Sequence, residues 1–174
     1  MTAWTEFYTP LAGESINYEG LFNMKEVFRI IDKYFRTKAW DKKIVFDEQY
    51  DTPNGRYVHV KTEYYKKTDS YVRLQQRQWI YANNLVEVEK EVNGVKIKTH
   101  QGKLSITFDA FIQTEYFGLW PSNRPLYFLF RVIYEQYLAR GKIAYWEEVS
   151  RHVANELKTE IAGYLNLNKF MYER

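Results

Sequence analysis

Two glutamines on one predicted strand are the first residues whose type and spacing suggest chemistry. In the alternating segment 70–81, Gln76 and Gln78 share a face with apolar residues, so both amides lie on the covered side if those apolar residues point inward. A buried amide needs hydrogen-bond partners. Three interpretations are open. The amides are polar anchors of an apolar pocket, they hydrogen-bond to neighbouring backbone or buried water, or they lie at the solvent-exposed end of the strand.

The pocket hypothesis draws apolar side chains from two further segments. Residues 103–117 alternate in polarity, and Phe108 and Ile112 fall on the apolar face. Phe130 belongs to a very apolar stretch of a predicted helix. A small apolar molecule between the sheet and that helix would contact the set Gln76, Gln78, Phe108, Ile112 and Phe130.

The opposite face of the glutamine strand combines cations with aromatic rings. Arg73, Arg77 and Trp79 alternate with the glutamines, and the preceding strand presents Tyr57 and Lys61 on the adjoining surface. Such a mixture can bind single-stranded RNA, because rings stack on bases while cations contact phosphates. Alternatively, the rings and cations pack on one another, or a protein partner uses the face.

No set of ionisable residues indicates catalysis or metal binding. Three glutamates alternate before Asn93-Gly94, a dipeptide that favours a two-residue hairpin and fixes its register. This register sets each glutamate opposite a basic or titratable residue, in the pairs Glu87 with His100, Glu89 with Lys98 and Glu91 with Lys96. The three histidines have no ligand-like spacing, and no phosphate loop or nucleophile motif occurs. We therefore expect no catalytic residue, metal or cofactor, and favour a non-enzymatic protein.

The elements that position these residues follow from periodicity and turn chemistry. Asn23 can cap a helix whose apolar stripe includes Val27, Ile31 and Phe35. Turn residues, among them Asn83-Asn84 and Gln101-Gly102, separate a run of strands with short, antiparallel connections. The predicted strands are 12–22, 44–50, 56–65, 70–81, 85–92, 95–99 and 103–117.

Two helices are predicted after the strands. The first covers residues 125–140 and meets Gly141, which would stop or kink it. The second begins at residue 142 and carries a sustained apolar stripe. Because the first helix is more apolar around its circumference, we expect it to lie between the sheet and the second helix. The fold class is thus α+β, an antiparallel β-meander of about six to seven strands against an amino-terminal helix and a carboxy-terminal helical pair.

Composition limits the class of protein. The 174 residues suit one domain, 1–174, with residues 1–10 and 169–174 expected to be flexible. A net charge of +3 is too small to attract nucleic acid without a local patch, whereas the 18% aromatic share suits a wide sheet or a sticky surface. Cysteine is absent, no signal-peptide pattern opens the chain, and no apolar stretch reaches the ~20 residues of a transmembrane helix. We expect a cytoplasmic protein.

The order strand, helix, antiparallel strands, long last helix resembles the helix-grip arrangement of the START and Bet v 1-like superfamily. That resemblance implies a curved sheet around the last helix and an apolar cavity between them. The chain also looks like small uncharacterised archaeal proteins, through residues 18–25, 87–94 and 134–138. The favoured function is a binding or interaction domain whose ligand is an apolar small molecule or a protein; the alternative is an RNA- or ribonucleoprotein-associated protein.

Overall fold

A computed structural model describes residues 6–92, 95–114 and 125–172 of the chain. Five antiparallel strands form one sheet in the order β1-β5-β4-β3-β2. The strands are β1 (Glu6–Phe22), β2 (Asp41–Thr52), β3 (Gly55–Lys67), β4 (Val72–Val92) and β5 (Val95–Thr114). The helices are α1 (Met24–Thr37), α2 (Pro125–Ile133), the π-helical segment η1 (Tyr134–Leu138) and α3 (Arg140–Tyr172). The predicted α+β class with an antiparallel sheet is confirmed.

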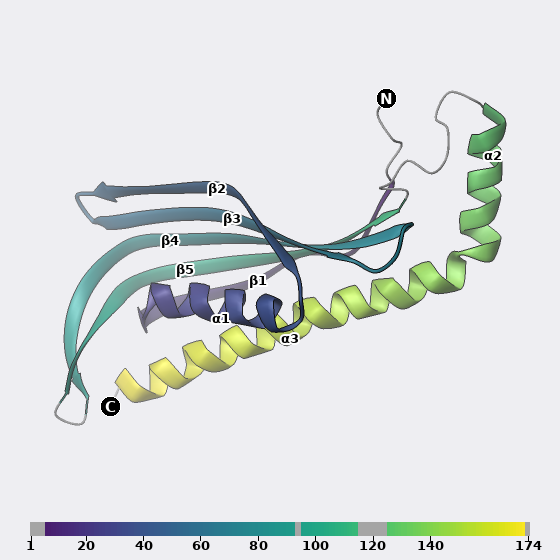
Figure 1. The fold of residues 1–174 in the computed structure, drawn as a ribbon. Coiled ribbons are helices and arrows are strands. Elements are labelled where there is room, and N and C mark those ends of the chain that lie inside the picture. The colour runs from purple at the N-terminus through teal and green to yellow at the C-terminus, as the bar shows by residue number, and fades with distance from the viewer. Residues whose placement is uncertain (1–5, 93–94, 115–124, 173–174) are drawn as a thin grey trace.

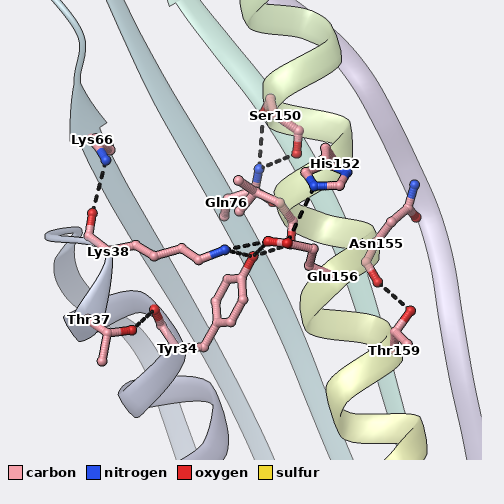
Figure 2. Close-up of polar contacts among 11 residues, drawn as sticks. Tyr34, Thr37, Lys38, Lys66, Gln76, Ser150, His152, Asn155, Glu156 and Thr159 are labelled. Carbon is pink, nitrogen blue, oxygen red and sulfur yellow. Dashed lines mark hydrogen bonds and ion pairs between the residues drawn. The ribbon is translucent and has the colours of Figure 1, made fainter.

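Helices α1 and α3 lie on the same side of the sheet (Figure 1). They bury one continuous core against it, with α3 crossing β1, β5 and β4. Tyr34 of α1 joins the two helices, because its hydroxyl donates to the carboxylate of Glu156 on α3 at 2.6 Å (Figure 2). Lys38 pairs with the same carboxylate. We call the helix-covered side the inner face of the sheet and the opposite side the outer face.

The start of α1 agrees with its local sequence signals. The Asn23 side chain accepts a hydrogen bond from the backbone N–H of Lys25 at 3.0 Å, which satisfies one of the free donors at the helix start. Val27, Ile31 and Phe35 are buried against the sheet, as their spacing predicts.

Two predicted turns are wrong, and the described residues form five strands where six to seven were predicted. Asn83-Asn84 forms a β-bulge within β4, with Asn84 at φ 54°, and Gln101-Gly102 lies inside β5. Glycines on both neighbouring strands make room for this bulge. A Cβ at Gly102 would lie 2.9 Å from the Asn83 carbonyl oxygen, and one at Gly55 would lie 2.8 Å from the Asn84 carbonyl carbon. Asn84, with its left-handed backbone conformation, therefore kinks a long strand instead of reversing the chain. The β4–β5 pair bends toward its tip (Figure 1).

The predicted register of the β4–β5 hairpin is confirmed. Glu87 lies opposite His100, Glu89 opposite Lys98, and Glu91 opposite Lys96. The Asn93-Gly94 turn itself falls outside the described residues. An exposed ion pair crosses the hairpin diagonally, with Lys98 Nζ 3.2 Å from Glu87. Glu87 and Glu89 are exposed and thus belong to a charged, solvent-facing ladder.

The carboxy-terminal helices depart from the sequence prediction. The chain changes direction at Ala139, after the π-helical turn, and Gly141 continues α3. Helix α3 lies on the sheet, whereas α2 leads away from it (Figure 1), so the predicted order of these two layers is wrong. Ser122 or Asn123 could cap the helix that the sequence predicts over residues 125–140, but both residues fall outside the described ones.

Candidate functional site

Gln76 and Gln78 are fully buried on the inner face, as predicted. The Gln76 amide nitrogen donates to the backbone carbonyl of Ser150 on α3 at 2.8 Å and lies 2.9 Å from the Ser150 hydroxyl oxygen (Figure 2). The amide oxygen of Gln78 accepts from the hydroxyl of Thr62 on β3 at 3.4 Å. These contacts give both glutamines a structural role, and Gln76 fixes the position of α3 on the sheet.

The remaining residues of the pocket hypothesis separate into two places. Phe108 and Ile112 are fully buried in the core beside the glutamines. Phe130 is 58% exposed on α2 and does not join them. Side chains of α3, including Leu157 and Ile161, occupy the space over the inner face. Oε1 of Gln76 and Nε2 of Gln78 make no hydrogen bond within the described structure. The hypothesis that the glutamines are polar anchors for a ligand therefore rests on these two atoms.

The outer face brings together the residues of the RNA hypothesis. Lys61 lies directly opposite Trp79, with its Nζ 4.4 Å from the centre of the indole ring. Arg77 pairs with Glu63 at 2.8 Å, and Arg73 donates to Gln113 at 2.6 Å. The cationic heads are therefore engaged by neighbouring rings, an amide and a carboxylate.

Aromatic rings of the outer face also pack on one another. The imidazole of His59 stacks on Tyr81 with 4.2 Å between ring centres, and on Trp79 with 5.8 Å. Tyr57 continues the row toward Tyr50 on β2, with 4.7 Å between those two rings. The contacts match the interpretation in which rings and cations of this face pack together.

Glu63 is the buried carboxylate of the outer face, and its titration gives a testable pH dependence. Burial acts to raise its pKa, but hydrogen bonds from Tyr65 and Arg77 and the charges of Arg77 and Lys61 outweigh burial, so the pKa lies below its usual value of 4.5.

Because the folded-state pKa is lowered, the stability that the ionised Glu63 contributes is fully present above pH 4.5. We expect it to be lost as the pH falls from there through the folded-state pKa. Urea titrations at a series of acidic pH values should show a weaker pH dependence for Glu63→Gln than for the wild type. The control Glu89→Gln, on the exposed hairpin, should keep the wild-type dependence; equal slopes in wild type and Glu63→Gln would contradict the prediction.

Sequence reasoning missed a buried polar cluster where η1 meets the sheet. Glu135 accepts from the Arg131 guanidinium at 3.3 Å and from the Thr114 hydroxyl at 3.1 Å. Tyr71 also donates to this carboxylate, and burial together with that bond raises the pKa of Tyr71. The Tyr8 hydroxyl lies 3.4 Å from the other oxygen of Glu135. Residues from β1, β5, α2 and η1, together with Tyr71 just before β4, thus converge on one carboxylate.

This cluster fixes which side of α2 faces solvent. Arg131 and Glu135 are buried, whereas apolar residues point outward, so the charges face in and the apolar side chains face out. We call the exposed set the α2 apolar surface: Leu126, Leu129, Phe130, Ile133, Tyr137 and Leu138. The sequence signal for it was Arg131 and Glu135 at i, i+4 spacing inside an otherwise apolar stretch. π-Helical turns of the kind seen in η1 are frequent at functional sites.

A surface pocket of about 790 Å³ lies beside the cluster, between η1 and the first turns of α3. Glu135 lines it together with Tyr8, Tyr137, Arg140 and Glu147. The carboxylate of Glu135 is already bound by the hydroxyl and guanidinium donors described above, so its part in the pocket wall is structural.

The histidines lie apart, His59 on β3, His100 on β5 and His152 on α3. Among the described residues, no three His, Asp or Glu side chains gather closely enough to hold a metal ion. Within the same described part of the chain, none of the helices has both the length and the apolar character needed to cross a membrane.

Comparisons with known proteins add no functional assignment. No protein-family model and no curated protein matches the chain. A solved structure of an uncharacterized protein from Rhizobium leguminosarum is 12% identical, and the match covers 64% of this chain and 82% of that one. Its TM-score of 0.18 shows too little structural similarity to support an argument about fold or function.

Proposed function

We propose that the protein is a non-enzymatic binding domain that presents the α2 apolar surface to an apolar groove on a protein partner. The observation that carries the proposal is the inverted orientation of α2, with Arg131 and Glu135 inward and side chains such as Leu126, 67% exposed, outward. A contiguous exposed apolar patch on the order of several hundred Å² is characteristic of an interaction site on a soluble monomer.

The spacing of the exposed residues suits helix-in-groove recognition. Leu126, Leu129, Phe130, Ile133 and Tyr137 follow one another at i, i+3, i+4, i+7 and i+11, which places them along one side of the helical segment. The Arg131–Glu135 pair anchors the opposite side of the helix to the sheet. A partner would therefore meet a preorganised helix, which lowers the entropic cost of binding.

Other occupants receive less support. A helix-grip-like fold remains our proposal for the arrangement of a long last helix across an antiparallel sheet, but α3 packs directly on Phe108 and Ile112, which leaves an apolar ligand poorly supported. RNA would compete with the contacts that engage Arg73 and Arg77. An anionic membrane attracts lysine and arginine, and the exposed described side chains of residues 126–138 include neither.

Charged substitutions on the α2 apolar surface should abolish partner binding without unfolding the domain. We expect the double variant Leu129→Asp with Ile133→Asp to lose a protein that co-purifies with the tagged wild type from its own cells, because aspartate cannot enter an apolar groove without a large desolvation cost. Gln136→Asp places one new charge at an exposed polar position of the same helical segment and serves as the matched control. Quantitative mass spectrometry of the purified complexes measures the loss.

Three results would contradict the proposed partner. The same proteins could co-purify with the double variant and with the control. The wild type could instead sediment with phosphatidylcholine and phosphatidylglycerol vesicles and the double variant not, which would assign the surface to a membrane. Finally, the wild type could self-associate in pure form and the double variant not, which would make a second copy the occupant.

A further inference from the structure

Strand β2 is an exposed edge of the sheet. It pairs with β3 on one side and with no described strand on the other. Every residue from 41 to 51 is exposed, so neither α1 nor α3 covers this strand as they cover the rest of the inner face. A strand of this kind leaves a row of backbone N–H and C=O groups available for pairing with another strand.

The exposed edge is also apolar at its centre. Ile44 is 56% exposed, and Val45, Phe46 and Tyr50 are exposed as well. A bulge between Ile44 and Phe46 and the flanking charges offer partial protection, but natural edge strands more often avoid such a run of apolar residues. Burial of these side chains against a second strand would remove apolar surface from water.

The charges of β2 specify which strand fits. The first half carries Lys42 and Lys43 beside Asp41 and is basic on balance, and the second half carries Asp47, Glu48 and Asp51. An antiparallel copy of the same strand brings the basic half of one chain against the acidic half of the other, whereas a parallel copy brings like charges together. A twofold symmetric dimer uses the same surface on both chains, which this self-complementary strand permits.

We propose that two copies of the chain pair antiparallel through β2, so that one sheet runs continuously across a homodimer. This self-association goes beyond the proposed partner binding, because it uses the edge strand and leaves the α2 apolar surface exposed. The dimer would cover the apolar centre of β2, pair its free backbone edge, and place complementary charges at both ends of the joined strands.

Charge-reversal variants of β2 test the pairing. Lys42→Glu with Lys43→Glu makes the strand uniformly acidic, and Asp47→Lys with Glu48→Lys makes it predominantly basic. Each variant alone should dimerise at least about tenfold more weakly than the wild type in sedimentation equilibrium, because like charges then face each other. An equimolar mixture of the two should form a heterodimer with restored affinity. Circular dichroism checks that each variant is folded.

Controls separate this interface from α2 and from stability effects. Lys42 also pairs with Asp32 at 2.8 Å, but this ion pair is exposed, so its loss should affect folding little. The variant Leu129→Asp with Ile133→Asp should keep the wild-type dimer, which distinguishes the β2 interface from α2. Three results would each overturn the proposal: a wild type that stays monomeric up to about 1 mM, charge-reversal variants that each dimerise as tightly as the wild type, or an equimolar mixture of the two that dimerises no more tightly than either variant alone.

Discussion

Replacing Glu135 by alanine is expected to lower the free energy of unfolding by about 3–5 kcal/mol, because the change removes one member of a buried ion pair, the carboxylate that the Arg131 guanidinium contacts at 3.3 Å. The hydroxyls of Tyr71 and Thr114 also lose the acceptor that they share. Equilibrium urea unfolding followed by circular dichroism measures the difference. An effect of this size would make the cluster a main determinant of the attachment of η1, and therefore of the orientation of α2.

Two further variants separate the buried charge from simple truncation. Gln136→Ala removes a side chain of similar size from the neighbouring exposed position, and should change the stability by less than about 0.5 kcal/mol. Arg131→Leu with Glu135→Leu replaces both charges by apolar groups, and should be much less destabilising than Glu135→Ala alone, since the two members of the buried ion pair are removed together. If the double variant were as unstable as the single one, the ion pair would not explain the loss.

The parts of the fold that were predicted from sequence rest on local signals. The Asn23 cap and the stripe containing Val27 and Ile31 specify α1 within one stretch of chain. The Asn93-Gly94 step specifies the β4–β5 register, because the two-residue turn leaves a single way to count outward. Both features depend on residues that are close together in the chain.

The parts that were missed depend on contacts between distant segments. Asn84 suits a turn or a bulge equally well. The bulge is favoured because Gly55 and Gly102 leave room for it, and these glycines lie beside Asn84 only after the strands pair. Ser150, the partner of Gln76, is 74 residues away in sequence. The burial of Arg131 and Glu135 depends on the hydroxyls of Tyr71 and Thr114, which come from earlier segments of the chain, and without those partners a charged pair would be expected to face solvent.

Helix α2 illustrates how such a miss changes the functional interpretation. Its apolar composition favours a buried position, and burial against the sheet was the natural prediction. In the structure, α3 fills that position and α2 remains exposed beyond the π-helical turn (Figure 1). The residue Phe130 therefore moves from a predicted ligand pocket to the α2 apolar surface.

A matched pair of phenylalanine truncations separates a packed core from a ligand cavity. Phe108→Ala should lower the free energy of unfolding by about 3–5 kcal/mol, because Phe108 is fully buried on the inner face of β5 and its removal leaves a void in that core. Phe130→Ala removes the same atoms from an exposed position and should cost less than about 0.5 kcal/mol. Urea unfolding of both variants under identical conditions gives the comparison.

The size of the Phe108 effect decides between the two hypotheses for the inner face. A side chain that lines a ligand cavity already lacks packing partners on one side, so truncating it forfeits fewer contacts than truncating one enclosed by the core. A loss below about 1 kcal/mol for Phe108→Ala, together with stabilisation of the wild type by an added fatty acid, would restore the apolar-ligand hypothesis. The full loss, with no stabilisation by fatty acid, would assign Gln76, Gln78, Phe108 and Ile112 to the core and would leave the binding proposals for the exposed surfaces of α2 and β2 as those still to be tested.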